Sequence, residues 1–394
     1  MNDIKGKRIV LLNLWNMVNS KGGAEKVFCN MANELSKRGA HVYGLIYEEK
    51  SGQPAFPLAK EVQLINAGWP RSGDLGYKFK RALLKTINTS LRSKKIKEII
   101  FDQKLMKKAG PIDKVLSEIL PEVIISFSCE ATYLVKSMTS HREVPLITMF
   151  HADPLGYALK FGFHQCQSAV NSSDCVQVLF PAYMESAKNY FPAVRLEVIP
   201  NCIARDTTMA ADLKNKKICY FARYDQVKRQ ALAIEAFALL RSKFPDWSLD
   251  FYGSTVSATY RKKLQARIEE LGAETQIRLN DAIDDVDAKL SETSIVIFPS
   301  EIEGFPLSVI EAMSMGIPVV GQKNCKGVAC LVEDGVNGFL CEDSPEDIAK
   351  KLEKLMLSHE LRLKMGQEAM SAMQQYSPER VWSKWEQLIG EVVR

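Results

Sequence analysis

The sequence predicts an α/β protein built from two Rossmann-like halves. Short apolar runs alternate with segments of helical period along the whole chain, which is the pattern of parallel sheets joined by crossover helices. A chain of 394 residues is longer than a domain with a single hydrophobic core usually is, and 46% of its residues are hydrophobic, so we expect two folded domains. A turn signal at Pro200 and the polar stretch behind it separate the two halves.

The first half opens with a strand, a turn and a helix. Residues 8–13 form an apolar run, Gly22 and Gly23 mark the turn, and the helix behind them keeps its apolar residues on one face until Gly39. The next strand is expected at 41–47. Further strands of this half are expected at 123–127, 145–150, 176–180 and 196–199.

The second half repeats the alternation. Its strands are expected at 217–222, 248–252, 276–279, 295–298 and 318–320. A last helix begins at Ser377 and Pro378, a serine cap followed by proline at the first helical position. Its apolar residues recur with the helical period, which predicts that this helix packs against a domain.

Cysteine usage and hydropathy indicate a cytoplasmic protein. The nine cysteines are odd in number and scattered, and several lie in apolar runs, as is typical of thiols in a reducing compartment. The apolar run at residues 9–12 is far shorter than the core of a signal peptide, and no stretch approaches the length of a membrane span.

The strongest chemical signal is a pair of glutamates eight residues apart. Glu303 lies in the turn behind a predicted strand, and Glu311 lies in the second turn of a helix that we expect to begin near Pro306. Backbone N–H groups at such a helix start bind anions, and carboxylates accept hydrogen bonds from vicinal hydroxyls. The spacing, at most about 12 Å of helical rise, suits a nucleotide sugar, with Glu303 at the sugar and Glu311 at the ribose.

Three further patterns lie behind predicted strands. Arg223 and Lys228 follow residues 217–222, where two cations can neutralise a diphosphate. Gly22 and Gly23 would let the backbone approach a phosphate or a sugar closely. His151 follows the strand at 145–150, at the edge that faces ligands in such sheets. Each pattern alone is also compatible with an ordinary turn, a surface charge pair or a structural histidine.

Together these segments resemble the retaining glycosyltransferases of family 4, which have the GT-B fold. The resemblance lies in the E-x7-E segment from Glu303 to Glu311, in Gly304 and Phe305, and in the G-R-x-x-x-x-K pattern, here with Ala222 in place of its glycine. The motifs occur in the family's order along nearly the whole chain.

The resemblance implies an acceptor-side domain at 1–200, a donor domain at 201–375 and a final helix, 376–394, that packs back on the first domain. It implies transfer of a hexose or N-acetylhexosamine, expected from a UDP-sugar, to a glycan or lipid-linked glycan. His151, Glu303, Arg223 and Lys228 would be catalytic. The donor would contact the following residues: Gly22, Gly23, Arg223, Lys228, Glu303, Gly304, Phe305, Leu307 and Glu311. No cofactor and no metal are expected.

Other functions remain open at this point. A non-hydrolysing nucleotide-sugar epimerase shares the fold, although the E-x7-E segment disfavours it, and a non-catalytic nucleotide-sugar binding module would use the same residues. Asp285 and Asp287 form a D-x-D pattern, which binds a metal in the GT-A fold. Here the pattern reads as an acidic helix start.

Positive charge is concentrated in one segment. Residues 71–108 contain 12 Lys and Arg against 3 acidic residues, so they carry +9, while the other 40 basic and 44 acidic residues leave −4. Five apolar residues of this segment share one helical face, namely Phe79, Leu83, Leu84, Ile87 and Leu91. We expect this segment to lie on an anionic membrane at the inner face of the cell membrane. A solvated helix over its own core and nucleic-acid binding are the alternatives, and no nucleic acid is expected.

Overall fold

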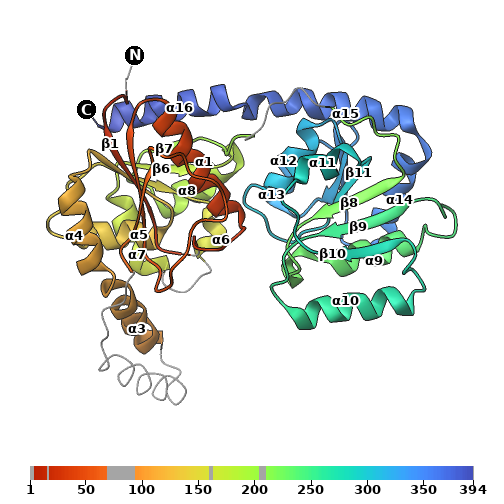
Figure 1. Cartoon of the computed structure of the whole chain (residues 1–394), viewed down its shortest axis with the longest axis horizontal. Coiled ribbons are helices and arrows are strands. Elements are labelled where there is room, and N and C mark those ends of the chain that lie inside the picture. Colours follow the sequence, from red (N-terminus) through yellow and green to blue (C-terminus); the bar gives the residue numbers. More distant parts are fainter. Residues whose placement is uncertain (1–3, 16, 69–93, 159–162, 204–209, 394) are drawn as a thin grey trace. The chain divides into compact units, whose positions relative to one another are not determined.

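The computed structural model describes residues 4–15, 17–68, 94–158, 163–203 and 210–393, which form two compact units (Figure 1). Unit 1 comprises Met1–Pro200 and Trp382–Arg394, and unit 2 comprises Asn201–Val381. Each unit contains one sheet in which neighbouring strands pair in parallel. Parallel pairing requires crossover connections, so the alternation of strands and helices predicted from the sequence follows. The predicted class, two Rossmann-like halves, is confirmed.

The sheet of unit 1 has the order β3-β2-β1-β4-β5-β6-β7. β1 lies in the middle, with Ile9 paired to Val42 of β2 and to Val123 of β4. Its inner strands are almost wholly buried, because helices cover both faces of a parallel sheet. The strands are β1 Arg8–Asn13, β2 His41–Ile46, β3 Gln63–Asn66, β4 Val123–Ser126, β5 Leu146–Met149, β6 Cys175–Val178 and β7 Leu196–Val198.

The helices of unit 1 connect these strands. Those with a clear start include α5, where the side chain of Ser128 accepts a hydrogen bond from the Ala131 N–H. The helices are α1 Gly23–Lys37, α3 Lys94–Met106, α4 Ala109–Ile119, α5 Cys129–Lys136, α6 Pro154–Ala158, α7 Phe163–Asn171, the 3₁₀ turn η1 Pro181–Tyr183 and α8 Met184–Tyr190.

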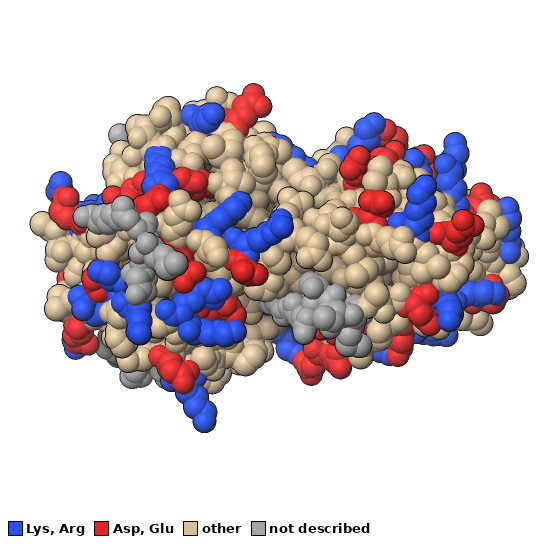
Figure 2. Space-filling view, turned by 90° about the horizontal axis from the view of Figure 1, so that it is seen from above, with Lys and Arg blue, Asp and Glu red and all other residues tan. Residues whose placement is uncertain are grey.

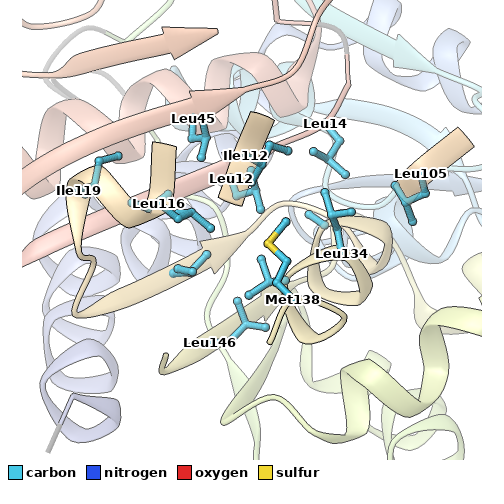
Figure 3. Packing of buried hydrophobic residues seen from close by; sticks show 14 residues of the cluster. Leu12, Leu14, Leu45, Leu105, Ile112, Leu116, Ile119, Leu134, Met138 and Leu146 are labelled. Atoms are coloured by element: carbon cyan, nitrogen blue, oxygen red, sulfur yellow. The ribbon is translucent and has the colours of Figure 1, made fainter. Parts of the chain in front are cut away.

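A large apolar cluster fixes α3 and α4 to this sheet (Figure 3). Leu12 and Leu14 come from β1 and the residues just after it, and Leu105 comes from the last turn of α3. All three are at most 2% exposed. Burying a leucine contributes about 1.5–3 kcal/mol, so the end of α3 is held firmly beside the carboxyl end of β1.

The sheet of unit 2 has the order β10-β9-β8-β11-β12-β13. Helices α9 and α10 lie on one side of it, and α11 and α12 lie on the other (Figure 1). The strands are β8 Lys217–Phe221, β9 Ser248–Tyr252, β10 Ile277–Asn280, β11 Ile295–Phe298, β12 Val319–Gln322 and β13 Gly338–Cys341.

Serine caps begin several helices of unit 2. Ser257, Ser344 and Ser358 each accept a backbone N–H at the start of α10, α14 and α15. The helices are the 3₁₀ turn η2 Gln226–Lys228, α9 Gln230–Ala238, α10 Ala258–Glu270, α11 Val286–Ser291, α12 Leu307–Ser314, α13 Lys326–Ala329, α14 Pro345–Leu357, α15 His359–Met373 and the 3₁₀ turn η3 Gln374–Tyr376.

The final helix, α16, spans Pro378–Val392, and its residues from Trp382 onward group with unit 1. Trp385 and Ile389 are at most 2% exposed. Glu386 forms an ion pair with Arg38, which follows α1, and Glu391 pairs with Arg195. The apolar residues that recur with the helical period therefore form the buried face of α16.

Two strands lie outside the sequence prediction. β3, Gln63–Asn66, is only partly buried, and β13, Gly338–Cys341, begins with a glycine. Both occupy the edge of their sheet. A partly buried strand shows a weak apolar pattern, which accounts for β3, whereas β13 is largely buried and this reason does not apply to it.

Most of the basic segment, residues 71–93, lies outside the described residues, as do the five apolar residues proposed for its membrane face. Its last part is α3 and the two lysines behind it. No helix in the described part of the chain has the length and hydropathy needed to cross a membrane. On the face shown in Figure 2, Lys and Arg are interspersed with Asp and Glu.

Candidate functional site

The point where the chain changes direction in the sheet of unit 2 lies between β8 and β11. After β8 the chain continues to β9 on one side, and after β11 it continues to β12 on the other. In open α/β sheets, ligands bind in the crevice outside the carboxyl ends of the strands at such a point. Residues behind β8 and β11 are therefore brought together.

Lys228 and Glu303 meet at this edge. The ammonium group of Lys228 lies 2.5 Å from Glu303 Oε1, and both side chains are about one-seventh exposed, at 15% and 13%. The hydroxyl of Ser300 donates to the same oxygen at 2.6 Å. Two residues predicted separately from two motifs thus form one partly buried ion pair with a third polar group attached.

The backbone around Lys228 is fixed from two sides. The Lys228 carbonyl accepts a hydrogen bond of 2.6 Å from the hydroxyl of Tyr220, on β8. Burial, reinforced by the charge of Glu303, holds the pKa of this phenol well above its ordinary value, so it remains a donor. The Val227 carbonyl accepts from the Glu301 N–H at 2.9 Å. These bonds tie the turn behind β8 to the turn behind β11.

Arg223 is held through its backbone and leaves its side chain accessible. The buried side chain of Gln230 donates to the Arg223 carbonyl at 2.8 Å. The guanidinium is 54% exposed and lies 3.4 Å from Asp225. Between these residues Arg229 adopts a left-handed backbone, φ 53°, and pairs with Asp343 at 2.7 Å. A non-glycine residue in this region costs about 1 kcal/mol, and the ion pair helps to hold it there.

The turn that carries Glu303 packs against a glycine of α13. A Cβ atom on Gly327 would lie 2.5 Å from the Glu303 carbonyl oxygen and 2.9 Å from the Gly304 carbonyl oxygen. Only glycine allows this close approach. The position of Glu303 therefore depends on a residue 24 positions further along the chain.

Helix α12 begins one residue later than the sequence indicates. Pro306 has an extended backbone and is the N-cap, and its carbonyl accepts from the Val309 N–H at 3.0 Å. Leu307 is the first helical residue. A proline has no N–H to leave unpaired at either position, so the physical reason for its presence is unchanged.

The remaining predicted donor residues differ in exposure. Glu311 lies in the second turn of α12 and is 9% exposed. Phe305 is 7% exposed, and its ring packs edge-on against Tyr376 with centroids 5.4 Å apart. The Phe305 ring therefore anchors the turn in the interior of unit 2.

Gly22 and Gly23 lie in unit 1, at the start of α1. The Glu25 carboxylate accepts from the Ser20 hydroxyl at 2.7 Å, and one of its oxygens would lie 2.2 Å from a Cβ atom on Gly22. Glu25 is the third helical residue and is 8% exposed. A carboxylate at this position satisfies backbone N–H groups at the helix start and interacts favourably with the helix dipole. A side chain at position 22 would require the Glu25 carboxylate to shift.

His151 follows β5 in unit 1. Its Nε2 is buried and has no hydrogen-bond partner in the described part of the chain, and its ring lies 5.2 Å from that of Phe127. Burial lowers its pKa to about 4, so the imidazole is neutral at pH 7. A buried nitrogen without a partner is the kind of group that a ligand hydroxyl can satisfy.

Asp285 acts as a helix cap. Its carboxylate accepts from the Ala288 N–H at 2.9 Å at the start of α11, and Asp287 lies in the first turn of that helix. The D-x-D pattern therefore forms the acidic helix start that the sequence indicates.

Comparison with known proteins agrees with this geometry. Residues 207–371 match the family model described as Glycosyl transferases group 1. An uncharacterized glycosyltransferase of Haemophilus influenzae is 26% identical over 94% of this chain and 97% of its own length. A Campylobacter jejuni N-acetylgalactosaminyltransferase named for a diphosphoundecaprenol-linked substrate is 20% identical over 95% and 96%.

The fold has close counterparts among solved structures. The crystal structure of Anabaena HepE in complex with UDP and glucose superimposes with a TM-score of 0.70, covering 97% of this chain and 99% of that one at 18% identity. Two Rossmann-like units of this kind define the GT-B class of fold. With the family model and the relatives, the chain is a GT-B glycosyltransferase that carries a group 1 transferase domain in unit 2.

Sequence reasoning missed the residues that support the site. Ser300, Tyr220 and Gln230 had no motif of their own, and Gly327 lies in a segment without a chemical signal. Glu25 was recognisable, because glutamate three positions after a helix cap is a known capping pattern. The others act through contacts between distant segments.

We predict that Gly327→Ala lowers kcat/KM by about tenfold or more while the protein stays folded. The added methyl must displace the Glu303 carbonyl, and overpacking of this kind typically costs about 1–3 kcal/mol. Gly110→Ala is the matched control, because a Cβ atom there meets no atom within 4 Å. Steady-state kinetics and circular dichroism check both. Unchanged kinetics in Gly327→Ala would show that the turn tolerates displacement.

We also predict that His151 makes stability depend on pH between 6.5, its ordinary pKa, and about 4. In this window the unfolded chain binds more protons than the folded one, so the contribution is complete above pH 6.5 and is lost as the pH falls. Its size is about 3 kcal/mol. Urea unfolding of His151→Gln should show a flatter decline between pH 6.5 and 4 than wild type. His41→Gln, which replaces an exposed histidine, is the control. Parallel curves for wild type and His151→Gln would contradict this role.

Proposed function

We propose that the chain is a retaining glycosyltransferase of family 4. It transfers a hexose or N-acetylhexosamine from a UDP-sugar to a glycan or lipid-linked glycan, without a metal ion. The observation that carries this proposal is the contact of Lys228 with Glu303 at the crevice of unit 2, with Arg223 exposed beside it.

Lys228 can act on two parts of the donor at once. Its ammonium group has three N–H donors, and Glu303 occupies one of them. A second can bind an oxygen of the diphosphate, with the exposed guanidinium of Arg223 as its partner. Both cations stabilise the charge that develops on the nucleotide as the bond to the sugar breaks. This supplies the electrostatic role that a metal ion has in other transferases.

Glu303 is suited to holding the sugar and poorly suited to attacking it. Its Oε1 already accepts hydrogen bonds from Lys228 and Ser300, so this oxygen is engaged by the protein. The other oxygen can accept hydrogen bonds from sugar hydroxyls. Retention then arises by departure of the nucleotide and attack of the acceptor on the same face of the sugar, with no covalent intermediate on the protein.

The donor and acceptor assignments draw on the comparisons. The HepE structure contains UDP and glucose, which supports a UDP-sugar as the donor. The name of the Campylobacter jejuni relative includes a diphosphoundecaprenol carrier, which supports a lipid-linked acceptor. A lipid carrier agrees with the +9 charge of residues 71–108, for which we propose contact with an anionic membrane.

We predict transfer from a UDP-sugar in the presence of EDTA, with kcat reduced about 10²-fold or more in Arg223→Ala and in Lys228→Ala. The two variants should differ in stability. Lys228→Ala leaves the partly buried Glu303 without its cation and should lower stability, whereas Arg223 is exposed and its pair contributes little. A donor-panel assay and thermal unfolding measure these effects.

Lys214→Ala, at an exposed lysine of the same unit, is the control. Loss of activity in EDTA that Mg²⁺ or Mn²⁺ restores would refute metal independence. Binding of nucleotide sugars without any transfer would indicate a binding module, and conversion of the donor alone would indicate an epimerase.

We further predict that the two glutamates differ in their ligands. Glu311→Ala should weaken both UDP and UDP-sugar, because its proposed partner is the ribose diol. Glu303→Gln should retain UDP affinity within about twofold and weaken the UDP-sugar about tenfold, since one charge-assisted hydrogen bond contributes about 1.5–3 kcal/mol. Isothermal calorimetry with both ligands measures this. Equal losses in the two variants would contradict the division.

A further inference from the structure

A tryptophan at the carboxyl end of β1 carries two lysine ammonium groups over its ring. Lys108 Nζ lies 4.1 Å from the ring centroid of Trp15, and Lys104 Nζ lies 5.5 Å from it. Lys108 also lies 5.0 Å from the ring centroid of Tyr47. We call Trp15, Lys104 and Lys108 the Trp15 cluster. It belongs to unit 1.

The Trp15 cluster is built on fixed supports. The side chain of Asn13, the last residue of β1, accepts from the Trp15 N–H at 3.1 Å and donates to the Trp15 carbonyl at 2.9 Å. Further along, the buried Glu48 carboxylate accepts from the Met17 and Val18 N–H groups. The lysines are fixed because Leu105, between them, is buried in the core of unit 1 (Figure 3).

The position of the Trp15 cluster is that of a ligand site. β1 lies between β2 and β4. After β1 the chain continues to β2 and β3 on one side of the sheet, and after β4 it continues to β5 on the other side. The carboxyl end of β1 therefore lies at the point where such sheets have their ligand crevice. Trp15 keeps 37% of its surface exposed there, and Lys104 is exposed. A large aromatic surface and an ammonium group are thus accessible together.

The two like charges lie close together, and Glu48, Glu49 and Glu130 offset the repulsion at Lys108 only in part. Lys104 and Lys108 are four residues apart and repel each other. Lys108 is only 7% exposed, and its Nζ donates to the Leu14 carbonyl at 3.1 Å. In the part of the chain that the structure describes, neither ammonium group has a carboxylate within ion-pair distance. Burial, then the charge of Lys104, lowers the pKa of Lys108 to about 8. An anion at this place would relieve the repulsion.

We propose that the Trp15 cluster is an acceptor subsite for a phosphorylated sugar, with the phosphate at Lys104 and the sugar on the exposed part of the Trp15 ring. Lys108 maintains positive charge beneath the ring. The inference rests on the proposed transferase function and adds the chemistry of the acceptor, a phosphate or diphosphate attached to its sugar. The same phosphate chemistry occurs in lipid headgroups, so the test separates the two sources.

The first experiment measures binding without any nucleotide. N-acetylglucosamine 1-phosphate is titrated into the full-length protein by calorimetry, with neutral N-acetylglucosamine as the comparison. We expect the phosphorylated sugar to bind at least tenfold more tightly than the neutral one. Lys104→Gln should bind the phosphorylated sugar about tenfold more weakly than wild type, which corresponds to the loss of one charge-assisted hydrogen bond. Trp15→Ala should weaken both sugars.

Lys114→Gln is the matched control, because Lys114 is an exposed lysine on the neighbouring helix α4. Lys108 is buried, so Lys108→Met is interpreted only if it unfolds cooperatively like wild type. Equal binding of the two sugars, or equal binding by wild type and Lys104→Gln, would overturn the proposal.

The second experiment uses vesicles of phosphatidylcholine with about 30% phosphatidylglycerol, which provide an anionic surface similar to that of a cell membrane. We expect Lys104→Gln to cosediment with them as wild type does. Loss of vesicle binding in this variant, with sugar-phosphate binding intact, would assign Lys104 to the lipid surface and overturn the proposal.

Transfer assays separate this inference from the proposed function. With a phosphorylated acceptor, Lys104→Gln should raise the acceptor KM about tenfold and leave the donor KM unchanged. If the enzyme is active and Lys104→Gln has the same acceptor KM as wild type, the subsite alone is refuted. A protein that transfers no sugar from any nucleotide donor would refute the function on which the subsite rests.

Discussion

Parallel pairing of every neighbouring strand is the constraint on which both units depend. A parallel pair needs a crossover connection, so each strand ends at the same edge as its neighbours and the next segment leaves from that edge. In unit 2 this brings the turns behind β8 and β11 together, and with them Lys228 and Glu303. In unit 1 the same rule exposes the turn behind β1, which carries Trp15. The two candidate sites therefore have one topological origin.

The two sites treat charge in opposite ways. In unit 2 the ammonium of Lys228 is matched by Glu303 and supported by Ser300, so the pair is neutral overall and its members can exchange partners with a ligand. In unit 1 Lys104 and Lys108 share an aromatic ring without a paired carboxylate among the described residues. A matched pair suits a donor that brings both hydroxyls and phosphates. An unmatched pair of cations suits a ligand that brings negative charge.

Much of the fold was predictable because the central strands are uninterrupted apolar runs. The boundaries expected for β1 and β11 agree with the structure, since both are buried on two faces. The edge strand β3 was missed because it is only partly buried and shows a weak apolar pattern, and β13 was missed although it is largely buried. The start of α12 differed by one residue, since proline satisfies both the N-cap and the first helical position.

The sequence by itself indicated the residues of the candidate donor site. Arg223, Lys228, Glu303 and Glu311 are recognisable because each follows a predicted strand with a spacing that suits a nucleotide sugar. The tertiary structure decided which of these groups touch, and which residues hold them in place. It also decided the surroundings of Lys108, because burial of one lysine in a basic segment depends on α3 packing against β1, and contacts between segments so far apart leave no periodic signal in the sequence.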